Sequence, residues 1–307
     1  MKNVLITGGT GLVGSELVKN LVSKGYHITV LTRNEKQHFS TSDVTYSKWD
    51  FRKDIIDQTV LEKADAIIHL AGAGVMDKRW TKAYQKEIVD SRTEILKYLL
   101  QKLKQCNHQV KTLVSASAIG WYGADLKEHY AFTEEDSYDN HFLGTTCKLW
   151  EESAELAENM GIRVCKLRLG IVLSEKGGAL PELMKPVKMG ITAILGSGKQ
   201  MVSWIHIEDL CRMFIYTLEN EKLSGSFNAV APQPTSHKNL MFSIARIMKR
   251  SFWIPIFVPS IILKCILGKR SIELLKSTTV SSKKISAEGF TFLYPEVGQA
   301  LKKMLRP

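Results

Sequence analysis

A glycine-rich stretch near the N-terminus restricts the fold more than any other feature of the chain. The run Gly8-Gly9-Thr10-Gly11-Leu12-Val13-Gly14 follows an apolar run at residues 4–7 and precedes a segment with apolar residues at helical spacing. Glycines at this spacing permit a tight turn, a close approach of backbone N–H groups to a pyrophosphate, and close packing of helix on strand. We therefore expect a dinucleotide-binding loop formed by Gly8, Thr10, Gly11, Leu12, Val13 and Gly14.

Short apolar runs alternate with helix-length segments in the first part of the chain. The predicted strands are residues 4–7, 28–32, 66–70, 112–115 and 164–167, and the predicted helices are residues 12–24, 81–104 and 145–159. This alternation predicts an α/β fold, a Rossmann-type doubly wound parallel sheet. We expect residues 1–173 to form the dinucleotide-binding domain, with returns to its sheet within residues 203–231. Residues 174–202 and 232–307 should form a smaller, mainly helical substrate-capping region.

Composition sets broad limits on the class of protein. Hydrophobic residues make up 44% and charged residues 24% of the chain, as in a soluble globular protein. The five cysteines are scattered without a CxxC pair, which favours a reducing, cytoplasmic location and no metal site. No export signal is recognisable. Residues 252–268 are apolar but interrupted by Pro255, Pro259 and Lys264, so we expect a buried segment and no integral membrane contact.

The charge of the chain is concentrated at its C-terminal end. Residues 238–307 contain 13 Lys or Arg and 3 Asp or Glu, whereas residues 1–237 contain 29 and 28. Because the excess lies in the predicted capping region, it favours an anionic substrate. A nucleic acid or an acidic membrane is the alternative, but no nucleic-acid-reading motif accompanies the basic residues, and we expect no nucleic-acid partner. These residues are Lys238, Arg246, Lys249, Arg250, Lys269, Arg270, Lys283 and Lys284.

The end of the second predicted strand bears on which dinucleotide binds. NAD sites usually have an acidic residue here for the ribose 2′-hydroxyl, but this chain has Thr32 and Arg33. An arginine pairs with a 2′-phosphate, so we expect NADP(H) to be favoured over NAD(H). Asp50 follows Trp49 at a position from which a side chain reaches the adenine amino group.

Several strings resemble one protein family. The glycine-rich loop, residues 69–73, 114–123, 167–170 and 203–210 resemble the extended, epimerase-like branch of the short-chain dehydrogenase/reductase superfamily. Arg79-Trp80-Thr81, Asp90-Ser91-Arg92, Cys147-Lys148-Leu149-Trp150-Glu151 and Gly196-Ser197-Gly198-Lys199-Gln200 narrow the likeness to the atypical group named "epimerase family protein". The resemblance implies cofactor contacts from Leu70, Ala71, Gly72 and the strand that contains Arg168.

The resemblance also implies a catalytic Ser or Thr, a Tyr, and a Lys four residues after the Tyr. Lys148 lies at the expected place for the Lys and should also bind the nicotinamide ribose, but Gly144 occupies the Tyr position. We expect Ser117 to orient the substrate and Tyr122 to replace the missing phenol, with a packing role for Tyr122 as the alternative. Arg79 and Trp80 are candidate substrate contacts. His69 and His206 are expected to be structural.

Together these features predict an NADP(H)-binding oxidoreductase or epimerase that acts on a small substrate, as a monomer or a homodimer. The alternative is a non-catalytic dinucleotide-binding sensor or regulator, since the usual catalytic Tyr position is Gly144.

Overall fold

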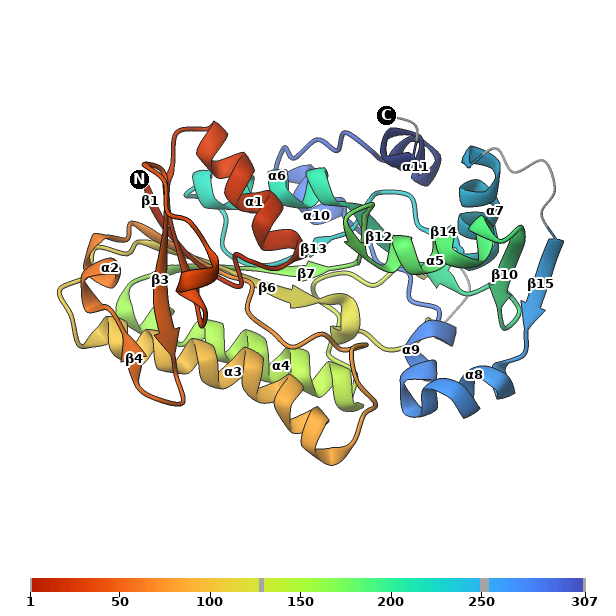
Figure 1. The fold of residues 1–307 in the computed structure, drawn as a ribbon, viewed down its shortest axis with the longest axis horizontal. Coiled ribbons are helices and arrows are strands. Elements are labelled where there is room, and N and C mark those ends of the chain that lie inside the picture. The colour runs from red at the N-terminus through yellow and green to blue at the C-terminus, as the bar shows by residue number, and fades with distance from the viewer. Residues whose placement is uncertain (1, 127–129, 249–253, 306–307) are drawn as a thin grey trace.

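The computed structural model describes residues 2–126, 130–248 and 254–305 (Figure 1). Its strands are β1 (Asn3–Thr7), β2 (His27–Thr32), β3 (Val44–Asp50), β4 (Ile55–Ile56), β5 (Ala66–His69), β6 (Thr112–Ala118), β7 (Arg163–Leu169), β8 (Ile171–Ser174), β9 (Gly177–Gly178), β10 (Ile191–Leu195), β11 (Met201–Val202), β12 (Trp204–His206), β13 (Gly225–Ala229), β14 (Thr235–Ser236) and β15 (Ile254–Val258). Its α-helices are α1 (Leu12–Ser23), α2 (Gln58–Lys63), α3 (Lys82–Lys104), α4 (Phe142–Glu155), α5 (Ala179–Lys188), α6 (Ile207–Glu219), α7 (His237–Ile247), α8 (Ser260–Leu267), α9 (Ser271–Leu275), α10 (Lys283–Ala287) and α11 (Val297–Leu305).

Within these ranges, the central sheet has the strand order β13-β7-β6-β5-β1-β2-β3-β4. Its neighbouring strands are parallel except β3 and β4. The chain moves outward from β1 through β2 and β3, then returns to β5 on the other side of β1 and moves outward again. This is the doubly wound α/β arrangement, so the predicted fold class is confirmed.

Helices cover both faces of this sheet: α1 and α6 lie on one face, and α3 and α4 on the other (Figure 1). The helix predicted at residues 81–104 is α3, which begins after Thr81 because the Thr81 side chain accepts the backbone N–H of Tyr84. Ile88, Leu96 and Leu99 lie on its buried side, as its helical spacing requires. The helix predicted at residues 145–159 begins earlier, at Phe142, and ends at Glu155.

Strand β3 had no counterpart in the predicted set of strands. Its sequence alternates polar and apolar residues, and only Ser47 and Trp49 are buried. Such a strand near the edge of a sheet carries a much weaker apolar signal than the central strands β1 and β5, which are apolar on both faces.

The second half of the chain adds small sheets and helices to one end of the molecule (Figure 1). The predicted return of residues 203–210 to the central sheet is wrong in part. Trp204–His206 pairs with β8 in a separate three-stranded sheet, and α6 follows at once. Gly225–Ala229 does return, because β13 pairs with β7 along its whole length.

Residues 254–268 are not buried, contrary to expectation. Ile254, Phe257 and Ile261 are 65%, 52% and 68% exposed, and Leu263 is the one large side chain of α8 below 10% exposure. The segment pairs on one side with β10 and is covered by no further layer of the described residues. Residues 252 and 253 of this predicted segment lie outside the described ranges. Among the described helices, none has the length and apolar character needed to cross a bilayer.

Candidate functional site

The predicted phosphate loop joins β1 to α1 at the carboxyl end of the sheet. Gly8 has a φ of 71°, and a Cβ on it would lie 2.7 Å from the carbonyl carbon of Leu70 and 2.8 Å from the nitrogen of Ala71. A Cβ on Gly14 would overlap the Gly8 carbonyl oxygen and lie 2.6 Å from the Cα of Gly9. Both glycines are therefore needed for the backbone of this loop to approach its neighbours this closely.

The start of α1 leaves backbone donors without partners. Gly11 is its N-cap residue and supplies no side-chain hydrogen bond, so the N–H groups of the first turn have no acceptor from the capping residue. These N–H groups and the positive end of the helix dipole suit a phosphate group. The loop lies where the sheet order reverses between β1 and β5, which is where dinucleotides bind in doubly wound sheets. The residues present fit a dinucleotide.

A buried chain of hydrogen bonds fixes the ends of β1 and β5 beside this loop. His69 Nε2 lies 3.3 Å from the carbonyl oxygen of Arg92 and donates to it, so Nδ1 accepts from the Thr7 hydroxyl at 2.7 Å. The Thr7 hydroxyl in turn accepts the N–H of Ala71 at 3.4 Å. Burial lowers the pKa of His69 to about 4, which keeps the ring neutral. This histidine has the structural role that the sequence predicted.

The segment after β5 is held from α3 by two residues whose role was not predicted. Ser91 Oγ accepts the N–H of Ala73 at 2.8 Å, and Arg92 Nη2 donates to the Ala73 carbonyl oxygen at 2.9 Å. A Cβ on Gly72 would lie 3.2 Å from the Arg92 guanidinium carbon. In the sequence, the string Asp90-Ser91-Arg92 was noticed only because it resembles the family, and that resemblance did not state that Ser91 and Arg92 hold this segment. Leu70, Ala71 and Gly72 are thus positioned opposite the phosphate loop.

The predicted adenosine-side residues lie at the same edge of the sheet. Arg33 follows β2 directly and its side chain is exposed. Asp50 ends β3, and its Oδ1 accepts the backbone N–H of Arg52 at 3.0 Å. Strands β2 and β3 are parallel neighbours, so their last residues lie at the same carboxyl edge of the sheet, where dinucleotides bind in this fold class.

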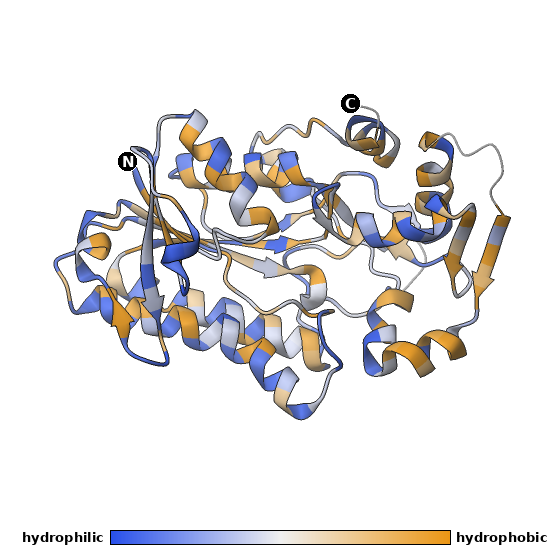
Figure 2. Cartoon of the chain, in the orientation of Figure 1, coloured by the Kyte–Doolittle hydropathy of each residue, from blue (hydrophilic) through white to orange (hydrophobic). Residues whose placement is uncertain are grey.

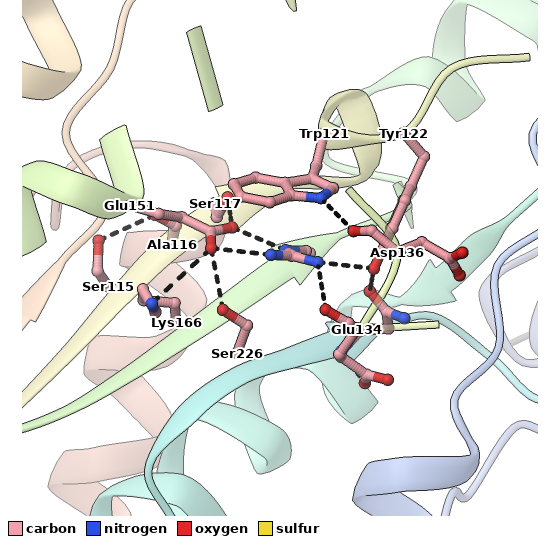
Figure 3. A network of polar contacts seen from close by, with 12 residues as sticks. Ser115, Ala116, Ser117, Trp121, Tyr122, Glu134, Asp136, Glu151, Lys166 and Ser226 are labelled. Carbon is pink, nitrogen blue, oxygen red and sulfur yellow. Dashed lines mark hydrogen bonds and ion pairs between the residues drawn. The ribbon is translucent and has the colours of Figure 1, made fainter. Parts of the chain in front are cut away.

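A buried polar network surrounds Glu151 on α4 (Figure 3). Glu151 is 3% exposed, and its carboxylate accepts from Ser117 Oγ at 2.7 Å and from Ser226 Oγ at 2.9 Å. Arg168 donates to both of its oxygens, from Nε at 2.8 Å and Nη2 at 3.0 Å. Lys166 lies 3.9 Å from the same carboxylate. The network therefore joins α4 to β6, β7 and β13.

The side chains of two predicted site residues, Arg168 and Tyr122, are buried and already paired, which favours the packing alternative for Tyr122. Arg168 is 3% exposed, and besides Glu151 it stacks on Trp121 with its guanidinium carbon 3.7 Å from the ring centre. Tyr122 is fully buried: its hydroxyl donates to Asn228 Oδ1 at 2.7 Å and accepts from Arg168 Nη1 at 2.9 Å. Burial raises the pKa of Tyr122 to about 12. The Arg168 guanidinium is therefore not available to a cofactor, and the phenol suits packing rather than proton transfer.

The structure also separates Lys148 from this network. The Lys148 ammonium pairs with Glu152 one turn further along α4, and its side chain is 34% exposed. Four residues earlier, a Cβ on Gly144 would overlap the Asp139 carbonyl oxygen and lie 2.7 Å from its carbon. No side chain fits at residue 144, so the tyrosine absent from the sequence has no space in this fold either. Ser117 and Tyr122 are joined through Glu151 and Arg168, whereas Lys148 pairs with Glu152 instead.

The two candidate substrate contacts lie at the N-terminal end of α3. Arg79 is exposed, whereas the Trp80 indole N–H donates to the Val75 carbonyl oxygen at 2.8 Å. The Trp80 ring meets Phe142 edge-on at a centroid distance of 5.0 Å. Trp80 therefore joins α3 to α4, and its indole N–H is already used.

A cavity of about 680 Å³ lies in the C-terminal part of the molecule. It is lined by the loop at residues 196–200, by Pro259 and Ser260 before and at the start of α8, and by residues 275–277. The chain that continues from residue 277 contacts the loop that follows β6, because the Thr279 N–H donates to Asp125 Oδ1 at 2.6 Å. Ser277 in the cavity wall donates from Oγ to Asp125 Oδ2 at 2.6 Å, so the cavity adjoins the loop that follows β6. Lys199 is a cation in its wall.

Burial of His237 makes the free energy of unfolding of this protein depend on pH. It is 5% exposed, neither ring nitrogen has a hydrogen-bond partner among the described residues, and burial lowers its pKa to about 4. Between pH 6.5 and 4 the unfolded chain binds a proton at this histidine that the folded chain does not, so stability falls as the pH falls. Between pH 7 and pH 5 this linkage should lower the free energy of unfolding of the wild type by about 2 kcal/mol. We expect His237→Phe to abolish that decrease, as measured by urea unfolding at the two pH values. His141→Gln, at a 92% exposed side chain, should leave the loss unchanged.

A family model described as the NAD dependent epimerase/dehydratase family matches residues 4–229, which include the whole sheet and the loop at its carboxyl edge. The chain belongs to this family. A second model, a domain of unknown function (DUF1731), matches residues 258–304. The family match confirms the predicted likeness to epimerase-family proteins.

Relatives of known sequence extend over the full chain. Epimerase family protein YfhF of Bacillus subtilis is 35% identical over 304 residues, which cover 99% of this chain and 98% of that protein. Epimerase family protein SSP1921 of Staphylococcus saprophyticus is 37% identical over 308 residues, with 99% and 100% covered.

Solved structures of the epimerase family share the fold. Human epimerase family protein SDR39U1, crystallised with NADPH, has a TM-score of 0.85 and 27% identity, and the match covers 99% of each chain. UDP-glucuronic acid 4-epimerase from Bacillus cereus, in complex with UDP-glucuronic acid and NAD, has a TM-score of 0.80. Its identity is 19%, with 99% of this chain and 98% of that chain covered, so it shows the fold alone.

Proposed function

We propose that this chain binds NADP(H) between the β1–α1 loop and the segment after β5, and that it acts as an oxidoreductase or epimerase on a small anionic substrate. The observation that carries the proposal is the steric restriction at Gly8 and Gly14, next to an α1 N-terminus with no side-chain cap. This geometry is what a backbone needs to approach a pyrophosphate. Bound NADP(H) would supply the hydride, and Gly8, Gly11 and Gly14 would hold its phosphates.

The preference for NADP(H) rests on the end of β2. Arg33 is exposed there, and an arginine offers a planar fork of donors to a 2′-phosphate. The residues at the end of β2 are Thr32, Arg33 and Asn34, so none of them is a carboxylate that could accept a ribose hydroxyl. The presence of NADPH in the human relative's structure agrees with this preference.

Replacing Arg33 tests the cofactor preference. We expect Arg33→Ala to weaken NADPH binding by about ten-fold or more, because one charge-assisted contact to a phosphate is lost, and to leave NADH binding unchanged. Fluorescence titration with each nucleotide measures both affinities. Arg246→Ala, which removes an exposed arginine on α7, is the matched control and should change neither. Equal losses for NADPH and NADH in Arg33→Ala would contradict the assignment.

The proposed substrate site is the cavity of about 680 Å³. Lys199 in its wall, and the hydroxyl groups of Ser197, Ser260 and Ser277, suit an anionic, hydrogen-bonding ligand.

For the reacting groups we propose a division of roles. Ser117 and Tyr122 position the loop at residues 119–123, since both hydroxyls are already bonded within the Glu151 network. Lys148 remains the proposed ligand of the cofactor ribose, because its side chain, in the middle of α4, is 34% exposed and its pair with Glu152 lies near solvent. Arg79 remains a proposed substrate contact.

Hydride transfer tests the activity itself. The purified chain with NADPH or NADP⁺ is offered a panel of carbonyl and alcohol compounds that includes anionic members, and the absorbance of the reduced nicotinamide is followed. A change with any member supports an oxidoreductase. Detection of the epimer of a sugar-type substrate with catalytic cofactor supports an epimerase. Tight NADPH binding without either result would favour the alternative of a non-catalytic dinucleotide-binding regulator.

A further inference from the structure

Exposed apolar side chains concentrate on one part of the described chain. Seven large ones lie between residues 254 and 272 and are 43–68% exposed: Ile254, Ile256, Phe257, Ile261, Ile262, Ile266 and Ile272. We call this the β15–α8 surface. Figure 2 shows β15 and α8 as apolar elements at the end of the molecule away from the central sheet. A concentration of exposed large apolar side chains in one segment is typical of a binding surface.

Helix α8 has apolar residues on both its buried and its exposed side. Leu263 faces the protein at 7% exposure, while Ile261, Ile262 and Ile266 fall on one exposed stripe at helical spacing. Lys264 is the charged residue of this otherwise apolar helix, and it is exposed. The described residues do not cover the stripe, which is therefore a candidate binding face.

Strand β15 shows the same exposure. It pairs only with β10 in a two-stranded sheet of the described residues. Ile254 and Ile256 point to one face of the strand and Phe257 to the other, and all three are exposed. Neither face of β15 is therefore packed against a layer formed by the residues that the structure describes.

The charges around the β15–α8 surface decide what it fits. No Asp or Glu occurs from residue 254 to 272, whereas Lys264 and Lys269 are exposed. Lys188 is exposed just before Gly190, whose carbonyl oxygen accepts the N–H of Ile254 at 3.0 Å. The next carboxylate, Glu273, is 23% exposed and already pairs with Lys276 at 2.9 Å. Two copies joined through this surface would therefore bring their exposed lysines together without a free carboxylate to pair with them. An apolar patch rimmed by cations suits the headgroup region of an anionic bilayer.

We infer that the β15–α8 surface docks this protein peripherally on anionic lipid membranes. The isoleucines and Phe257 enter the boundary between headgroups and acyl chains, and Lys264, Lys269 and Lys188 contact lipid phosphates. Pro259 and Ser260 belong to the same segment and line the cavity of about 680 Å³, so docking brings this cavity next to the lipid surface. The inference stands on exposure and charge alone and does not depend on the proposed activity.

Vesicle flotation tests the inference with the full chain. We expect the protein to float with vesicles of equal parts phosphatidylcholine and phosphatidylglycerol, to stay unbound with phosphatidylcholine alone, and to be released by salt. Ile261→Ser with Ile266→Ser should weaken partitioning by about 100-fold or more, since two apolar side chains no longer leave water. Lys264→Gln with Lys269→Gln should weaken it by about 25-fold, from the loss of two lysines at an anionic surface.

A matched double variant away from this surface separates docking from general loss of apolar area. Phe39→Ser with Leu156→Ser removes side chains that are 92% and 44% exposed, and should float as the wild type does. The thermal midpoint of each variant verifies folding. Equal partitioning of wild type and Ile261→Ser with Ile266→Ser would overturn the inference. So would a dimer in light scattering that these two substitutions dissociate, with no vesicle binding by the wild type. NADPH affinity is measured on the same preparations, so failure of the cofactor proposal is recognised separately.

Discussion

Glu151→Ala is expected to lower the free energy of unfolding by about 3–5 kcal/mol, because it leaves the buried Arg168 guanidinium without its counter-charge, whereas Lys166 keeps its pair with Glu155. Arg168 is 3% exposed and makes two hydrogen bonds to this carboxylate, and Lys166 lies beside it at 6% exposure. Ser117 and Ser226 lose an acceptor at the same time. Urea unfolding followed by circular dichroism measures the difference between variant and wild type.

The adjacent glutamate provides the control. Glu152 also pairs with a lysine, Lys148, but its side chain is 47% exposed. Glu152→Ala should therefore cost at most about 1 kcal/mol, as exposed ion pairs do. Equal effects of the two substitutions would mean that the Glu151 network does not stabilise the fold in the way its burial indicates.

Gly14→Ala is expected to weaken NADPH binding by about 100-fold or more. The new methyl group would overlap the Gly8 carbonyl oxygen and crowd Gly9, so the loop and the first turn of α1 must move apart. Backbone N–H groups then lose their alignment with the phosphates, and each such charge-assisted hydrogen bond contributes about 1.5–3 kcal/mol. Isothermal titration with NADPH measures the loss.

A glycine in open surroundings is the matched control for this substitution. A Cβ on Gly298 in α11 meets nothing within 4 Å, so Gly298→Ala should leave NADPH affinity unchanged and stabilise its helix slightly. If Gly14→Ala bound NADPH as tightly as the wild type while remaining folded, the β1–α1 loop would not be the phosphate site.

The cofactor end of the site was predictable because its signal is local. Gly8, Gly11 and Gly14 lie within seven residues, and both the strand before them and the helix after them could be recognised from their own spacing. Arg33 could be placed for the same reason, since it follows directly on a recognisable strand.

The arrangement of the predicted catalytic side chains could not be derived from the sequence, because spacing along a helix does not state which way each side chain points. Cys147 and Glu151 lie on the buried side of α4, whereas Lys148 is rotated by about 100° from Cys147 and pairs with Glu152 near solvent. Tyr122 was predicted from its distance in sequence to Ser117, but its hydroxyl bonds to Asn228, more than one hundred residues away.

The amino-acid sequence by itself determined the doubly wound sheet, the glycine-rich turn between β1 and α1 and the family, because strand–helix alternation and glycine spacing are properties of neighbouring residues. Only the tertiary structure decided that Arg168 is a buried partner of Glu151, and that residues 254–268 are exposed. The physical reason is the same in both cases. Burial depends on whether distant parts of the chain cover a side chain, and the apolar character of β15 and α8 does not state whether the protein itself provides that cover.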